Sequence, residues 1–138
     1  MKHVYKYQLS SPQEFNHIRK DIHEQLVRWF SGDQMLVDLA MFEAVTNSWR
    51  HGHLKDEQKV IDITVLFNNQ SLIVRIKDEG HGFIVPNSLQ PQNFFKKQPV
   101  ELNFDSGRGI ELIDSIMDEV IYSSTGNEVL MRKWYTVN

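Results

Sequence analysis

Residues 60–78 read VIDITVLFNNQSLIVRIKD and carry the clearest fold signal in the chain. Residues 60–67 and 71–78 each alternate with a period of two, which is the pattern of a half-buried strand. The tripeptide Asn-Asn-Gln between them is short enough to join them as a hairpin. The stretch therefore predicts two antiparallel strands.

The residues upstream of this hairpin predict one strand and a first helix. Residues 3–9 (HVYKYQL) alternate like a strand. A helix start follows: Ser11 can cap the helix, Pro12 suits the first helical position, and Glu14 sits where a capping box requires Glu or Gln. Gly32 ends this helix. Its apolar stripe consists of Phe15, Ile18, Ile22, Leu26 and Trp29.

A second helix is predicted from Asp33, which can cap it, to His51, with Gly52 as its stop. One face begins with an apolar stripe of Leu36, Leu39 and Ala40. The other sides carry Met35, Val37, Met41, Phe42, Val45 and Trp49. A helix that is apolar all round is expected to be largely buried.

Toward the C-terminal end of this helix the apolar stripe becomes polar, with Glu43, Asn47 and Arg50 in line. A buried carboxylate or amide is costly unless it is paired or bound to something. Two interpretations stay open at this point: Glu43 pairs with Arg50 or another basic group, or the polar groups bind a ligand. A histidine metal site is the weaker interpretation, because His51 and His53 are two positions apart and do not meet on a helix.

Two glycine motifs follow the hairpin. In DEGHGF (78–83), Asp78 ends a strand beside two glycines, which permit close approach of a ligand to the backbone. In SGRGI (106–110), two glycines open a helix, whose free N–H groups and dipole favour an anion. Arg108 could add a phosphate contact. Taken singly, each motif also fits a plain turn or a loop-to-helix joint.

The remaining segments complete the predicted order β-α-α-β-β-lid-α-β-β. Residues 84–107 hold three of the four prolines without a sustained period, as in a functional lid. Residues 108–119 read as a helix with Ile110, Ile113 and Met117 on one face, and residues 119–123 and 128–135 as strands around a turn. The expected fold is an α/β (α+β) two-layer sandwich, with a mostly antiparallel mixed sheet and helices on one face.

Composition restricts the class of protein. Of 138 residues, 41% are hydrophobic and 24% charged, so we expect one globular domain over residues 1–138. The net charge of −3 argues against a nucleic-acid binder, and the absence of cysteine excludes thiolate metal sites. No apolar run approaches the roughly 18 residues of a membrane span, and no signal-peptide core begins the chain. We expect a cytoplasmic protein without a membrane or nucleic-acid partner.

The order of the motifs resembles the GHKL superfamily of Bergerat-fold ATP-binding domains. EAVTNSWRHG (43–52) resembles its N-box, DEGHGF its first glycine box, and GRGIELIDSIMDEV (107–120) its second. With the closing GNEVLMRK (126–133), the chain looks like the small anti-sigma-factor serine/threonine kinases of bacterial partner-switching systems. The resemblance covers about residues 10–133, and it implies that ATP and Mg²⁺ are bound.

The resemblance implies a role for each matching residue near the phosphates. Glu43 matches the general base, and Asn47 the Mg²⁺ ligand one helical turn away. The phosphate-binding end of the lid corresponds to Gly107, Arg108 and Gly109.

The resemblance also implies which residues bind the base. Asp78 matches the residue that binds the adenine amino group, and Gly80 and Gly82 match the glycines that shape its pocket. The family commonly has Gly-Thr in the last hairpin, where this chain has Gly126 and Asn127. The Asn127 amide can still donate and accept hydrogen bonds, so it is assigned to the same pocket.

Two functions are compatible with these motifs. The first is a kinase that phosphorylates a STAS-type antagonist protein and sequesters a sigma factor or similar regulator, with a homodimer expected from the family. The alternative is a nucleotide-gated binding module with little or no phosphotransfer. The catalytic half of a histidine kinase fits poorly, because no second hairpin helix precedes the ATP-binding motifs.

Overall fold

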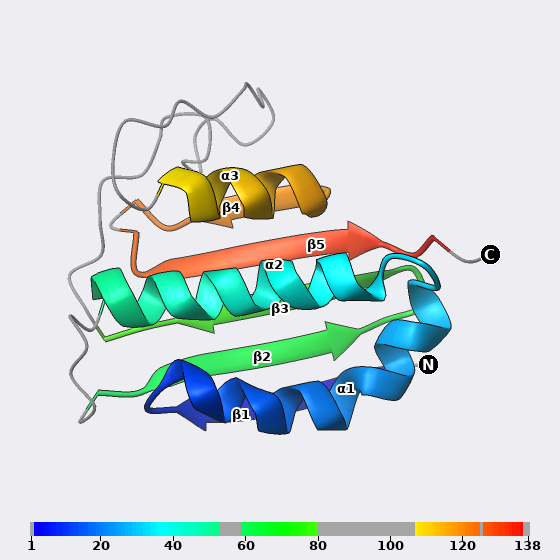
Figure 1. Ribbon diagram of the computed structural model, residues 1–138, viewed down its shortest axis with the longest axis horizontal. Coiled ribbons are helices and arrows are strands. Elements are labelled where there is room, and N and C mark those ends of the chain that lie inside the picture. The colour runs from blue at the N-terminus through cyan, green and yellow to red at the C-terminus, as the bar shows by residue number, and fades with distance from the viewer. Residues whose placement is uncertain (1, 53–58, 80–106, 125, 137–138) are drawn as a thin grey trace.

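The computed structural model describes residues 2–52, 59–79, 107–124 and 126–136. These ranges form one five-stranded sheet with helices packed on one of its faces (Figure 1). The strands are β1 (His3–Leu9), β2 (Ile61–Phe67), β3 (Ser71–Lys77), β4 (Glu119–Tyr122) and β5 (Glu128–Trp134). The helices are α1 (Phe15–Trp29), after a 3₁₀ turn at Pro12–Glu14, α2 (Gln34–Asn47) and α3 (Gly107–Ile116). The predicted two-layer fold and element order are confirmed.

The sheet is built around the predicted hairpin of β2 and β3. Its strand order is β1-β2-β3-β5-β4, and each of these four pairings is antiparallel. The Asn68 side chain stabilises the turn, because its Oδ1 accepts hydrogen bonds from the N–H groups of Gln70 and Ser71, both at 2.7 Å. Alternate residues of β2 are buried beneath the helices: Ile61, Ile63, Val65 and Phe67.

Helix α1 packs on the sheet as predicted, but its start differs in detail. Phe15, Ile18, Ile22 and Leu26 are buried. Pro12 takes the first position of the preceding turn, yet the Ser11 side chain makes no capping hydrogen bond. Instead, the Glu14 carboxylate accepts a hydrogen bond from the Ser10 N–H at 3.0 Å. Gly32 has a φ of +94°, which explains why a glycine follows this helix.

Two expectations for α2 are corrected by the structure. The α-helix ends at Asn47 and continues as a π-helical turn over Ser48–Gly52, instead of running as α-helix to His51. Asp33 stands at the N-cap position, but its side chain forms no capping hydrogen bond.

The prediction that α2 is largely buried all round is wrong for its N-terminal half. Met35, Leu36 and Leu39 are 80%, 49% and 37% exposed. The buried face instead carries Val37, Ala40, Met41, Ala44 and Val45. The physical reason is that α2 lies on the sheet between α1 and α3, and none of the described helices or strands covers its outward side (Figure 1).

Helix α3 packs beside α2 and over β4, with Ile110, Ile113 and Met117 buried as predicted. The Lys133 ammonium of β5 donates to the Ile116 carbonyl at 2.8 Å, which caps the last turn of α3. None of the helices in the described ranges is long and apolar enough to cross a membrane.

Candidate functional site

The segments that carry the predicted site residues meet at one end of the sandwich. The C-terminal end of α2, the end of β3, the start of α3 and the start of β5 lie together on the left of Figure 1. Asn47, Asp78 and Asn127 are therefore brought to the same end, although up to 80 positions of sequence separate them. Predicting each helix and strand separately would not bring these three residues together, because their proximity depends on the directions in which all four elements run.

Asn47 is the most informative side chain of α2. It is only 4% exposed, and its Nδ2 atom has no hydrogen-bond partner among the residues that the structure describes. A buried amide nitrogen without a partner costs about 1–3 kcal/mol, so such atoms call for an explanation. A polar ligand at this end of the sandwich would supply the missing partner.

Glu43 lies one turn before Asn47 and is partly buried. Arg50 is exposed, and no ion pair joins these two side chains, both of which lie within the described ranges. The interpretation that Glu43 pairs with Arg50 is therefore wrong. The carboxylate stays on the polar stripe of α2 beside the buried amide.

Asp78 is held firmly at the end of β3. Its side chain is 3% exposed, and its backbone N–H donates to the Asn127 carbonyl at 2.9 Å. Ile76 of β3 and Val129 of β5 are a buried cross-strand pair. Asp78 and Asn127 each lie two positions from this pair, toward the same end of the sheet. Asp78 and Asn127 thus lie opposite each other, one position beyond the last pair of the β3–β5 ladder, Lys77 and Glu128. Neighbours across a ladder have Cβ atoms about 5 Å apart.

Asn127 is further fixed by a residue that the sequence motifs do not single out. The Ser123 hydroxyl donates to Asn127 Oδ1 at 3.0 Å. Gly126, with a φ of +81°, turns the chain between the two, and its N–H donates to the Ser123 carbonyl at 2.9 Å. The only sequence signal for Ser123 is its position four residues before Asn127 across a predicted turn.

Beneath α3, the Tyr122 side chain closes the core at this end of β4. Burial, together with the negative charge of Asp114, raises the pKa of the Tyr122 hydroxyl above its ordinary value. The shift follows from the complete burial of this side chain in the core.

Several predicted residues fall outside what the structure describes. Gly80, Gly82, His53 and residues 84–106 of the predicted lid lie there. Gly107, Arg108 and Gly109 form the first turn of α3 in the backbone, and their side chains are not described. The predicted phosphate-binding segment thus begins a helix of ten residues, whose N-terminal end offers N–H groups and a positive dipole end.

The donor set at this end fits Mg²⁺ with a nucleotide better than a dedicated metal centre. No group of three or more histidine, cysteine or acidic side chains that could hold a metal occurs in the described ranges. A buried amide, a buried carboxylate and a helix N-terminus are instead suited to phosphates and a polar base.

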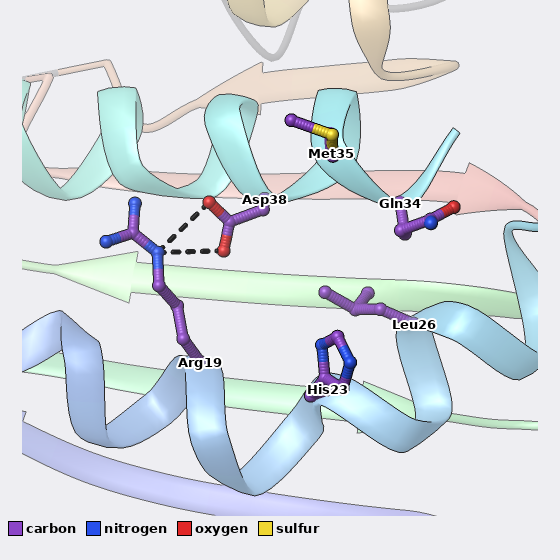
Figure 2. Close-up of a pocket in the computed structure, with 6 residues that line it drawn as sticks. All are labelled: Arg19, His23, Leu26, Gln34, Met35 and Asp38. Atoms are coloured by element: carbon purple, nitrogen blue, oxygen red, sulfur yellow. Dashed lines mark hydrogen bonds and ion pairs between the residues drawn. The ribbon is translucent and has the colours of Figure 1, made fainter. Parts of the chain in front are cut away.

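A concavity lies away from these residues, between α1 and α2 (Figure 2). It measures about 280 Å³ and is lined by Arg19, His23, Leu26, Gln34, Met35 and Asp38. The Arg19 guanidinium bridges the two helices through Nε, which donates to both carboxylate oxygens of Asp38 at 3.0 Å. None of the predicted site residues lines this groove, and two of its charged groups, Arg19 and Asp38, are already paired across it.

Comparisons with known proteins agree with the geometry. A family model described as a histidine kinase-like ATPase domain matches residues 10–133. The chain is 32% identical over 97 residues to an anti-sigma F factor of Geobacillus sp. strain WCH70, covering 68% of this chain and 64% of that protein. It is 31% identical over 98 residues to the serine-protein kinase RsbW of Listeria monocytogenes strain EGD-e, covering 70% and 62%. The aligned region thus spans less than two thirds of the length of these relatives.

Proposed function

The chain belongs to the histidine kinase-like ATPase domain family, and on that basis we propose that it is an ATP-dependent serine/threonine protein kinase and anti-sigma factor. The observation that carries the proposal is the burial of Asn47 and Asp78 at the same end of the fold, beside the start of α3. Relatives named anti-sigma F factor and serine-protein kinase support the same activity.

In this proposal the nucleotide lies at that end of the sandwich. The Asp78 carboxylate accepts a hydrogen bond from the adenine amino group, with Gly80 and Gly82 shaping the pocket. Asn47 holds Mg²⁺ against the phosphates, and Gly107, Arg108 and Gly109 bind the phosphates at the helix start. Bound Mg²⁺ supplies charge neutralisation to the phosphates.

Glu43 acts as the general base. Its carboxylate takes the proton of the acceptor serine or threonine hydroxyl, and that oxygen forms a bond to the γ-phosphorus of ATP. The bond from the γ-phosphorus to the bridging oxygen breaks, so that ADP leaves with the electron pair. Glu43 and Asn47 are one helical turn apart on one stripe, so proton removal and metal binding occur side by side.

The proposed partners follow from the family. The phosphate acceptor is a STAS-type antagonist protein, and the sequestered partner is a sigma factor or an analogous regulator. The protein acts as a homodimer in the cytoplasm, as a single domain over residues 1–138. The alternative function, a nucleotide-gated binding module without phosphotransfer, uses the same residues apart from the base.

The two functions are separated by Glu43→Ala. General-base catalysis contributes about 10²–10⁴-fold, so this variant should lose that much transfer of labelled phosphate from ATP to the antagonist, while still binding ADP. Glu24→Ala, which removes an exposed glutamate of α1, is the matched control and should transfer at the wild-type rate.

Two outcomes would count against the kinase. Transfer by Glu43→Ala at the wild-type rate would remove Glu43 as the base. Absence of transfer by the wild type, with ADP binding intact, would leave the binding module. His53→Ala should preserve both binding and transfer, and a large loss there would restore the histidine metal site.

A further inference from the structure

The sheet has one face that none of the described helices covers. The α-helices of the described ranges all lie on its other face (Figure 1). Alternate residues of each strand are buried or partly buried beneath these helices, so the residues between them lie on the uncovered side. We call this side the open face. Its apolar residues are Val4, Leu66, Ile73, Ile121, Leu130 and Trp134.

The open face has the composition of a protein–protein interface. Val4 is 50% exposed, Leu130 43% and Trp134 42%. The Arg132 guanidinium lies 5.2 Å from the centre of the Trp134 ring, so an arginine and a tryptophan stand together on this face. Both residue types are enriched in interfaces, above all among the residues that contribute most to binding. A partner that covers this face would remove apolar surface from water.

The shape of the open face is self-complementary. Ile121 of β4 and Leu130 of β5 are cross-strand partners, and together they form a ridge. A hollow of about 70 Å³ borders this ridge toward Arg132, and a hollow of about 280 Å³ borders it toward Glu128. In a two-fold symmetric interface the same patch of both copies meets itself, so a patch with both a ridge and hollows can receive its own copy.

The charges of the open face favour a particular arrangement of two copies. Lys77 of β3 and Glu128 of β5 are cross-strand partners, so they lie at the same level of the sheet. A two-fold axis parallel to the strands and midway between β3 and β5 sets β3 of one copy against β5 of the other. Lys77 of each copy then faces Glu128 of the other, which makes two opposite-charge contacts. Glu128 already pairs with Arg75 of its own copy, so Lys77 would extend this pair into a network.

The size of the open face is also sufficient for a dimer. Four of the five strands have seven residues. With strands about 4.8 Å apart and a rise of about 3.3 Å per residue, the face measures roughly 500 Å² in projection. Stable interfaces take about 600–1,000 Å² of accessible surface from each partner. Because side chains make the accessible surface larger than its projection, the open face reaches the small end of this range.

We propose that the open face is the surface through which two copies of this chain pack, with β3 of one copy against β5 of the other. The inference rests on the homodimer of the proposed function, and it adds the surface, the symmetry axis and the central residues. Leu130 lies at the centre of the contact, and Lys77 and Glu128 fix the register. Helices α2 and α3 lie on the opposite face, so both proposed nucleotide sites stay outside the contact.

The first test measures the mass of the full chain by sedimentation equilibrium over a range of concentrations. The wild type should reach twice the chain mass of 16.2 kDa. Leu130→Asp places a carboxylate at the centre of the interface and should raise the dimer dissociation constant by about 30-fold or more. Leu39→Asp on α2 is the matched control, because Leu39 is 37% exposed on the other side of the molecule, and this variant should remain dimeric.

A charge exchange tests the register without changing an apolar residue. Lys77→Glu and Glu128→Lys should each weaken the homodimer, because like charges then face each other. An equal mixture of the two variants should form heterodimers more tightly than either variant forms homodimers, since both intermolecular contacts regain opposite charges. This rescue also gives a readout if Leu130→Asp is poorly folded. Lys20→Glu, on the exposed side of α1, should not change the dissociation constant.

The results that would overturn this inference differ from those that would overturn the kinase. A wild type that stays monomeric at all concentrations, or a Leu130→Asp variant that dimerises as tightly as wild type, would remove the interface. A charge-exchange mixture without rescue would contradict the proposed axis. The monomeric Leu130→Asp variant should still bind Mg-ADP with wild-type affinity. Failure of the wild type to bind ADP would instead remove the nucleotide site and leave the interface in place.

Discussion

The two halves of α2 differ in which kind of side chain they bury and which they expose. Its N-terminal half exposes apolar side chains, with Met35 80% and Leu36 49% exposed, whereas its C-terminal half buries the Asn47 amide to 4%. Exposed apolar residues are common and cost little, but a buried polar group without a partner is expensive. The difference teaches that the unusual residue of this helix is a buried polar one, Asn47, and the proposed nucleotide site would account for its burial.

Position relative to neighbours explains why the halves differ. The N-terminal half borders the groove beside α1, which Gln34, Met35 and Asp38 of α2 help to line (Figure 2). The C-terminal half ends among the start of α3 and the ends of β3 and β5 (Figure 1). Burial at that end is therefore imposed by the surrounding elements, and not by the hydrophobicity of the residues that it encloses.

The largest effect is expected for Met41→Ala, on the core face of α2. Met41 is fully buried, so truncation leaves a cavity and should lower the free energy of unfolding by about 2–5 kcal/mol. Urea denaturation followed by circular dichroism measures this change. A loss below about 0.5 kcal/mol would mean that the helix does not pack on the sheet along this face.

A large but different effect is expected for Asn47→Ala at the polar end. In the proposed function this variant removes the Mg²⁺ ligand, so it should weaken Mg-ADP binding by about 10- to 100-fold, as measured by isothermal titration. Stability should change little, because the variant also removes the unpartnered buried Nδ2 atom.

The control for Asn47→Ala is Asn16→Ala, which removes an exposed asparagine of α1 and should bind Mg-ADP normally. If Asn47→Ala bound nucleotide normally but unfolded more easily, the amide would be structural, and the contrast between the two halves of α2 would have no functional meaning.

The smallest effect is expected for Met35→Ser in the N-terminal half. Because Met35 is mostly exposed, the free energy of unfolding should change by no more than about 0.5 kcal/mol, and Mg-ADP affinity should stay constant. The same denaturation and titration experiments measure both. Destabilisation comparable to that of Met41→Ala would show that this side of α2 is covered in solution, contrary to the comparison above.

Much of the fold could be predicted from local signals. The alternation in residues 60–67 and 71–78, the stripe from Phe15 to Leu26, and the glycine at position 32 each report on their own neighbourhood. Predictions that required knowledge of a neighbour were weaker. The Ser11 and Asp33 side chains form no capping hydrogen bonds, and the interpretation that pairs Glu43 with Arg50 was wrong, because residue types alone do not determine which conformation each side chain adopts.

In the candidate site, too, some features could be predicted from local sequence and others depend on tertiary contacts. Its glycine and carboxylate motifs could be picked out one by one, and their order along the chain supported the family, which the comparisons confirm. The roles of the individual site residues stay predictions. The hydrogen bond between Ser123 and Asn127 could not be predicted from sequence, because it crosses a turn whose geometry depends on Gly126.

By itself, the sequence determined the strands, the helices and the family. Periodicity and turn chemistry act over a few residues, so they can be read without knowing the fold. Only the tertiary structure decided that β5 lies between β3 and β4, which places Asn127 beside Asp78, and that the outward side of α2 stays exposed. These outcomes depend on strand order and on which neighbour covers which face, and such contacts join residues far apart in the chain.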